Sequence, residues 1–255
     1  MGTYVKVTNK DRVLSIEIDR AERKNAITAD MYQSMADALR SAEADAQVRA
    51  VLIHGKPDCF TAGNDLKDFL ERPPSGDNSP VFQFLQAIAT ATKPLVAAVG
   101  GPAVGIGTTM LLHCDFIYAA PNARFQMPFV TLGLVPEAAS SLLLPMLAGY
   151  QRAAELLLLG KPFTAEKALA VGIVTEIIPE GDLLDYATGV AQGIAALPSS
   201  SVRMTKALMK SRYASAVGEA MAAEGEKFRA QLASPEAKEA MQAFFEKRKP
   251  DFSRF

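Results

Sequence analysis

Apolar strand-like runs alternate with helical segments through the first half of the chain, and this order constrains the fold more than any single motif. Runs at 50–53, 95–99 and 114–119 predict strands, while 29–46, 81–91 and 106–113 predict helices. A further strand is predicted over 171–178. This alternation of strand and helix indicates an α/β domain.

Three parts of the chain depart from this alternation: the N-terminal residues, the segment 72–80 and the part after residue 139. Residues 4–8 and 12–18 predict a β-hairpin, because apolar positions alternate along the second run. Residues 72–80, with three Pro, Gly76, Asp77 and Asn78, predict a mobile surface loop. After residue 139 the chain is mostly helical, and 182–247 predicts helices only, with breaks at Pro198 and near Pro235. We therefore expect a core domain over 1–195 and a helical region over 196–255.

Composition excludes several classes of function. The chain has 255 residues, of which 49% are hydrophobic, so one large domain can bury a substantial core. Its formal net charge of -1 disfavours nucleic acid or a membrane surface as the main partner. The two Cys and two His lack the spacing of a structural zinc site, since no Cys-x-x-Cys occurs and His113 and Cys114 are adjacent. No apolar run reaches the ~20 residues of a membrane span, and no signal peptide is evident, so we expect a cytoplasmic protein.

Two glycine-containing turns each join a strand to a helix. The first holds Gly63 before a helix that begins near Asp65, and the second holds Gly105 and Gly107. Free backbone N–H groups at a helix start can receive an anion, and two such turns could direct two N–H groups at one oxygen. Alternatively, Asn64 or Asp65 does no more than cap its helix.

Glu137 is the third candidate for chemistry. Apart from Asp115, it is the only carboxylate between Gly100 and Gly149, and it follows an apolar run. The ordinary interpretation is a surface glutamate. Partial burial among the flanking apolar residues would instead raise its pKa toward the value that a general base needs.

These segments together resemble the enoyl-CoA hydratase/isomerase family, the crotonase superfamily. The resemblance covers nearly the whole chain and rests on five segments: Arg23-Lys-Asn-Ala-Ile, Phe60-Thr-Ala-Gly-Asn-Asp-Leu, Lys93 to Gly107, Cys114-Asp-Phe-Ile-Tyr-Ala, and Ala165 to Ile178. It implies a spiral of strand–strand–helix (ββα) units with a C-terminal helical trimerisation region. It also implies a homotrimer or a dimer of trimers that binds acyl-CoA thioesters. Coenzyme A would be part of the substrate, and no separate cofactor or metal is expected.

The same resemblance assigns roles to single residues. The thioester oxygen would lie in an oxyanion hole formed by the backbone N–H groups of Asn64 and Ile106. Contacts with coenzyme A and the acyl group are expected from a larger set: Arg23, Lys24, Ala26, Ala62, Gly63, Asp65, Leu66, Gly105, Phe129, Phe244 and Lys247. The last two match a C-terminal Phe/Lys pair that in the family sometimes belongs to a neighbouring subunit. A solvated helix charge is the competing interpretation of Lys247.

The acidic residues favour one branch of the family. Hydratases use two glutamates, at positions that here hold Thr109 and Phe129. The segment from Pro128 to Ser141 resembles instead the Δ3,Δ2-enoyl-CoA isomerases of the peroxisomal type, in which the catalytic glutamate maps onto Glu137. The sequence therefore predicts an isomerase with a single catalytic base, Glu137, and Phe129 as part of an apolar wall.

Other classes stay open at this point. They are another crotonase-type enzyme, such as a hydratase, hydrolase or decarboxylase, and a non-catalytic acyl-CoA or RNA-binding protein. Net charge disfavours RNA. A serine hydrolase is disfavoured because the chain has no Gly-x-Ser-x-Gly and Ser140-Ser141 has no evident His partner.

Overall fold

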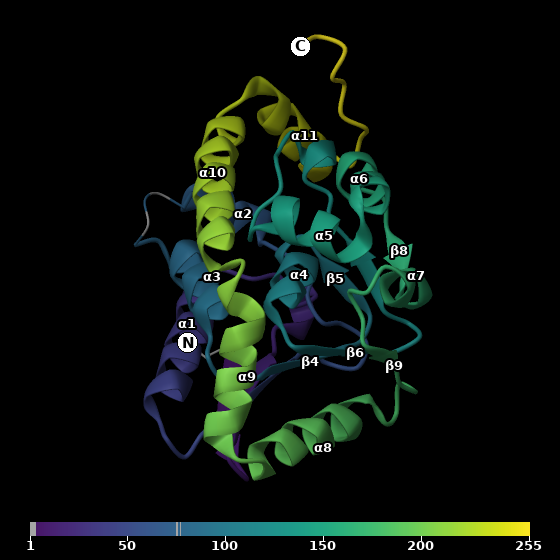
Figure 1. Cartoon of the computed structure of the whole chain (residues 1–255). Helices are drawn as coiled ribbons and strands as arrows, with labels where there is room; N and C mark the ends of the chain where they lie inside the picture. The colour runs from purple at the N-terminus through teal and green to yellow at the C-terminus, as the bar shows by residue number, and fades with distance from the viewer. Residues whose placement is uncertain (1–3, 75, 77) are drawn as a thin grey trace.

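The computed structural model describes residues 4–74, 76 and 78–255, and it has a parallel sheet at its centre (Figure 1). Six strands pair in the order β1-β2-β3-β4-β6-β9. Only the first pair is antiparallel among these strands, as the predicted hairpin requires. The strands are β1 (Val5–Lys10), β2 (Val13–Ile18), β3 (Ala50–His54), β4 (Leu95–Val99), β6 (Phe116–Ala119) and β9 (Glu176–Ile177).

A small second sheet carries part of the site. It has the order β5-β7-β8, with β5 (Pro102–Val104) parallel to β7 (Arg124–Gln126) and β8 (Phe163–Thr164) antiparallel to β7. In Figure 1, β5 and the helices α4 and α5 lie between the large sheet and α11. The two sheets therefore form the frame on which the glycine turns are placed.

Helices cover the sheets and make up the C-terminal part. Three of them are short 3₁₀ turns: η1 (Ala21–Arg23), η2 (Met110–His113) and η3 (Val130–Leu132). The α-helices of the first half are α1 (Ala29–Ala44), α2 (Leu66–Glu71), α3 (Pro80–Thr90) and α4 (Ile106–Thr109). Those of the second half are α5 (Ser140–Ala148), α6 (Tyr150–Leu159), α7 (Ala165–Ala170), α8 (Leu183–Ala196), α9 (Ser199–Ser211), α10 (Ala214–Leu232) and α11 (Pro235–Phe245).

The core explains why the central strands read as continuous apolar runs. All residues of β3 and β4 are buried, because helices cover both faces of the sheet. Alternate residues such as Leu52 and Val96 pack on α8, whereas Val51 and Leu95 belong to the larger core on the other face. Side chains of α1 and α3 complete that larger core.

Most predicted elements are confirmed, and two differ in extent. The helix predicted over 106–113 is α4 followed by the tighter 3₁₀ turn η2. The strand predicted over 171–178 is wrong for its first half, because only Glu176 and Ile177 pair with β6. Val171 and Val174 are buried in the turn after α7, so their apolar character reflects core packing. Of the predicted loop at 72–80, residues 75 and 77 lie outside the described residues.

The C-terminal helices do not stand apart from the rest of the described chain. α10 packs on α5, and α11 packs on η3. The C-terminal helices therefore cover the segment that carries Glu137. The division of the chain at residue 195 stays a prediction. No helix in the described ranges is both long and apolar enough to cross a membrane.

Candidate active site

The two glycine turns lie against each other because Thr61, just before the first turn, forms a parallel β-bridge with Ala103 of β5. Thr61 N donates to Pro102 O at 2.9 Å, and Val104 N donates to Thr61 O at 3.0 Å. Gly63 has φ +86°, and a Cβ there would lie 2.6 Å from Val104 O. Any larger residue would therefore separate the turns, which explains a glycine at this position.

Each turn presents a backbone N–H group that is free to bind a ligand. Gly63 O and Asp65 N both bond to the backbone of Ile27, while Gly105 N donates to Gln126 O. Among the described residues, the N–H groups of Asn64 and Ile106 have no hydrogen-bond partner. They stand at the starts of α2 and α4, where unpaired N–H groups are expected. The pair has the chemistry of an oxyanion hole.

A cavity of about 640 Å³ brings the candidate residues together. All predicted site residues line it except Lys247: Arg23, Lys24, Ala26, Ala62, Gly63, Asn64, Asp65, Leu66, Gly105, Ile106, Phe129, Glu137 and Phe244. Lys247 follows α11 and lies outside this cavity of its own chain, so its predicted contact stays a prediction. Phe69, Phe228 and Met241 give the cavity further apolar walls.

Glu137 lines this cavity and is almost completely buried, with 7% of its surface exposed. Its Oε1 atom is buried and has no hydrogen-bond partner in the described part of the chain. Burial, and secondly the charge of Glu224, raise the pKa of Glu137 from its ordinary 4.5 to about 8. A carboxyl group with such a pKa, facing a cavity, can accept and return a proton near neutral pH.

The two positions at which the resemblance predicts the glutamates of a hydratase, 109 and 129, have no acidic side chain here. Thr109 is fully buried, and its hydroxyl donates to Gly105 O at 3.4 Å. Phe129 is also buried and forms part of the apolar wall. The pair of acids that would position a water molecule is therefore missing from these two places.

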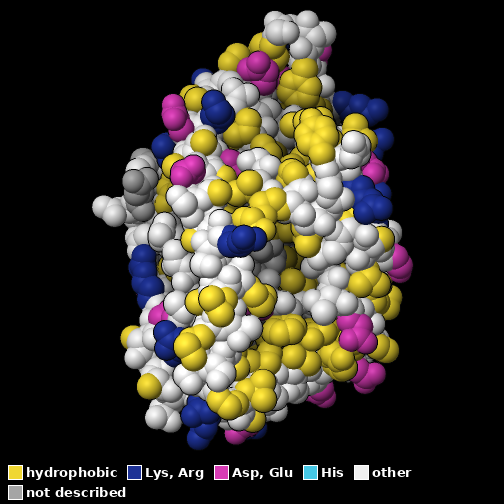
Figure 2. Space-filling model, viewed as in Figure 1, with side chains coloured by type: hydrophobic (Ala, Val, Ile, Leu, Met, Phe, Trp, Pro, Cys, Tyr) yellow, Lys and Arg dark blue, Asp and Glu magenta, His cyan; other side chains and the backbone are white. Residues whose placement is uncertain are grey.

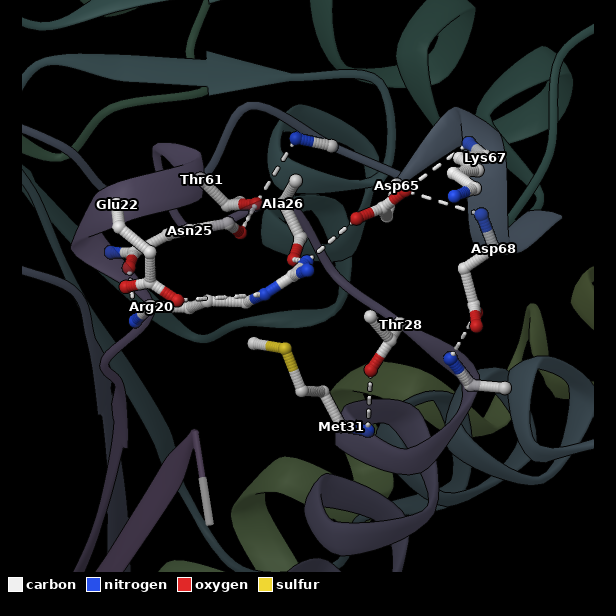
Figure 3. A network of polar contacts seen from close by, with 12 residues as sticks. Arg20, Glu22, Asn25, Ala26, Thr28, Met31, Thr61, Asp65, Lys67 and Asp68 are labelled. Atoms are coloured by element: carbon white, nitrogen blue, oxygen red, sulfur yellow. Dashed lines mark hydrogen bonds and ion pairs between the residues drawn. The ribbon is translucent and has the colours of Figure 1, made fainter. Parts of the chain in front are cut away.

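A network of polar contacts holds the loop before the first turn (Figure 3). The Arg20 guanidinium donates to Asp65 Oδ2 at 2.7 Å and to Ala26 O at 2.9 Å. Asp65 caps α2 by accepting from the backbone N–H groups of Lys67 and Asp68. Burial alone would raise the pKa of Asp65, but these hydrogen bonds and the charge of Arg20 hold it below its ordinary value.

Two buried side chains near Glu137 were not predicted. The Tyr32 hydroxyl donates to Asn64 Oδ1, and burial together with the charge of Glu137 raises the pKa of Tyr32. Glu224, on α10, accepts from the backbone of the Glu137 segment. The phase of α10 could have identified Glu224, because it shares the buried face with Gly225 and Phe228.

A second cavity, of about 470 Å³, lies between α3, α9 and α10. It contains neither glycine turn nor Glu137, so the first cavity is the candidate active site. No group of three or more His, Cys, Asp or Glu side chains able to hold a metal ion occurs among the described residues.

Comparison with known proteins gives the family. The family model described as "Enoyl-CoA hydratase/isomerase" matches residues 8–254. A solved enoyl-CoA hydratase/isomerase from Pseudoalteromonas atlantica is 45% identical, covers 98% of this chain and 100% of its own, and superposes with a TM-score of 0.94.

Curated relatives include both isomerases and hydratases. Enoyl-CoA delta isomerase 2 of Homo sapiens is 36% identical over 81% of this chain, and the match spans only 54% of the human enzyme's length. The 2,3-dehydroadipyl-CoA hydratase of Escherichia coli is 30% identical over 96% of this chain and 97% of its own. With its paired sheets, glycine turns and C-terminal helices, the chain has the crotonase fold and belongs to the enoyl-CoA hydratase/isomerase family.

Proposed function

We propose that the chain is a Δ3,Δ2-enoyl-CoA isomerase, which shifts the double bond of a 3-enoyl-CoA to give a trans-2-enoyl-CoA. The observation that carries the proposal is the buried, unpaired carboxyl group of Glu137, which lines the same cavity as Asn64 and Ile106, the residues with free N–H groups. Similarity to enoyl-CoA delta isomerase 2 supports it.

One base is enough for this reaction. The Glu137 carboxylate removes a proton from C2, and the electron pair moves into a dienolate whose negative charge lies on the thioester oxygen. The N–H groups of Asn64 and Ile106 bind that oxygen. The Glu137 carboxyl group then delivers the proton to C4, leaving the double bond between C2 and C3.

The energetics fit the geometry. One oxyanion donor typically lowers the barrier by about 3–4 kcal/mol, and the effect requires a site from which water is excluded. The apolar walls from Phe129 and Phe228 provide that exclusion. No added water and no separate cofactor are needed, since coenzyme A enters as part of the substrate.

Two parts of the proposal concern binding and assembly. Arg23 and Lys24 at one rim of the cavity suit the phosphates of coenzyme A, and Phe244 and Phe245 form another rim. The active form is a homotrimer or a dimer of trimers, in which Lys247 would contact coenzyme A, either in its own subunit or in a neighbour.

A hydratase is the second candidate, because curated hydratases reach similar identity over nearly the whole chain. It would need acids at places other than 109 and 129. A hydrolase, a decarboxylase or a non-catalytic acyl-CoA binder would leave isomerisation undetected.

The deciding experiment compares 3-enoyl-CoA isomerisation with 2-enoyl-CoA hydration in wild type and in Glu137→Gln. We expect wild type to isomerise, and the substitution to lower kcat by roughly 10²–10⁴-fold. Glu226→Gln is a matched control, because Glu226 is an exposed acid on α10. Strong hydration by wild type, or isomerisation that survives Glu137→Gln, would exclude the proposed function.

A further inference from the structure

The turn that presents Glu137 has an unusual backbone. Ala138 and Ala139 follow it directly and have φ of 60° and 55°. Residues with a Cβ rarely occupy this left-handed region, and two in succession are rarer still. Both alanines are buried. Such a conformation persists only where the surrounding structure holds it in place.

The carboxylate of Glu224, on α10, accepts two hydrogen bonds from the backbone of this turn. Its Oε2 accepts from Ala139 N at 2.6 Å, and its Oε1 accepts from Ser141 N at 2.8 Å. The carboxylate thus caps the first turn of α5, whose own N-cap residue is an alanine and has no side-chain cap. His113 Nε2 donates to Ala138 O at 2.8 Å. Burial lowers the pKa of His113 to about 4, so a neutral ring makes this contact.

Glu224 is also a buried charge close to Glu137. Only 7% of its surface is exposed, and both carboxyl groups line a small cavity between α3 and α10. Burial raises the pKa of Glu224, while the N–H groups of Ser141 and Ala139 favour its ionised form. A buried charge is costly unless it is hydrogen-bonded, and the two backbone N–H groups of the Glu137 segment offset part of that cost for Glu224.

We propose that Glu224 is a positioning residue for Glu137: its carboxylate fixes the left-handed turn and holds a second negative charge beside the Glu137 segment. This inference rests on the proposed role of Glu137 as the base. Glu224 does not itself touch the substrate, since it does not line the main cavity.

In the described part of the chain, the other ionisable groups linked to this pair are Tyr32 of α1, whose pKa is raised by burial and by the charge of Glu137, and His113 of η2, which bonds to Ala138. Arg229, on α10 itself, lies over the Phe82 ring. The charged residues that line the main cavity with Glu137 are Arg23, Lys24, Asp65 and Lys67. Of all these groups, Glu224 is the acid bonded to the Glu137 segment, so its removal gives the cleanest test.

The test is the pH dependence of isomerisation in Glu224→Gln, with Glu226→Gln as the control. Without the charge of Glu224, we expect the acidic limb of kcat/KM to move roughly one pH unit lower. We expect the plateau to fall by about tenfold, because a weaker base in a less rigid turn transfers the proton more slowly. The two enzymes should therefore differ least near pH 6. A parallel loss at every pH, with no shift, would show a merely structural role and overturn the proposal.

A direct titration separates this inference from the proposed function. The infrared band of the Glu137 carboxyl group is identified by its loss in Glu137→Gln and followed against pH without substrate. Its midpoint should fall in Glu224→Gln whether or not the protein is an isomerase. An unchanged midpoint overturns the role of Glu224, whereas failure of isomerisation alone overturns only the proposed function.

A second variant keeps the proposal testable if Glu224→Gln alone does not fold. Glycine adopts the left-handed region freely, so Ala139→Gly in the Glu224→Gln background removes the strain that Glu224 balances. The double variant should fold, keep the lowered midpoint and regain part of the plateau. A double variant that folds but titrates like wild type would contradict the proposal.

Discussion

Burial of Glu137 has a consequence for stability as well as for catalysis. Its ionised form is stabilised better by water than by the apolar cavity, so the folded state holds the proton more tightly than the unfolded chain does. Between the ordinary pKa of 4.5 and the folded value of about 8, the unfolded chain has lost a proton that the folded protein keeps. The free energy of unfolding therefore falls as pH rises through this window, by at most about 1.4 kcal/mol per unit.

Glu137→Gln removes this dependence because glutamine does not ionise. The variant should be similar to wild type near pH 5 and more stable at pH 8, by on the order of 2–4 kcal/mol. Urea denaturation at pH 5, 6.5 and 8 measures the difference, with Glu226→Gln as the exposed control. A constant difference across these pH values would mean that Glu137 is not a buried acid with a raised pKa.

At the scale of elements, the start of α2 links stability to the site. Asp65 caps this helix and pairs with Arg20 (Figure 3). It directly follows Asn64, which lines the cavity. Asp65→Ala removes the cap and deprives the largely buried Arg20 guanidinium of the carboxylate 2.7 Å away. We expect a loss of roughly 2–4 kcal/mol in the free energy of unfolding. We also expect kcat/KM for isomerisation to fall by about tenfold or more, because Asn64 N–H loses its fixed position.

Thr164→Ala is the matched control for this helix start. Thr164 caps α7 by accepting from Lys167 N at 3.3 Å, and it does not line the cavity. Losing this cap should cost about 1 kcal/mol and leave kcat/KM unchanged. If Asp65→Ala lowers stability but not kcat/KM, the network supports only the fold.

Local patterns predicted the elements whose causes are local. Asp65 does cap its helix, and Gly63 does stand at a turn with positive φ. The contact from Glu224 to Ala139 joins positions 85 residues apart, and no local pattern fixes such a distance. The strand at 171–178 was overestimated because apolar residues in a buried turn have the same composition as a buried strand. The sequence therefore predicted most strands and helices and singled out Glu137 as a candidate. The hydrogen bonds between Glu224 and the Glu137 segment could be found only in the three-dimensional structure.

At the scale of the whole molecule, helix α9 exposes large apolar side chains on the face that does not pack against the rest of the subunit. In α9, Val202 and Lys206 turn inward, whereas Met204, Leu208 and Met209 are 60–75% exposed. Figure 2 shows hydrophobic side chains spread over the lower part of this face, where Figure 1 places α8 and α9. Exposed apolar surface of this kind marks interaction sites, and the proposed trimer gives it an occupant, a second copy of the chain.

Leu208→Asp tests whether this helix takes part in assembly. A subunit has a mass of 27.3 kDa, so light scattering should give three or six times that value for wild type. A carboxylate at a position that is 75% exposed in the monomer costs the folded subunit little, but it is costly once buried between subunits. We therefore expect Leu208→Asp to shift the mass toward 27.3 kDa with the circular dichroism spectrum retained.

Val7→Asp, at an exposed apolar position on the edge strand β1, should leave the mass unchanged. A wild-type protein that is monomeric at micromolar concentration would exclude the trimer, and an intact oligomer in Leu208→Asp would place its interface away from α9.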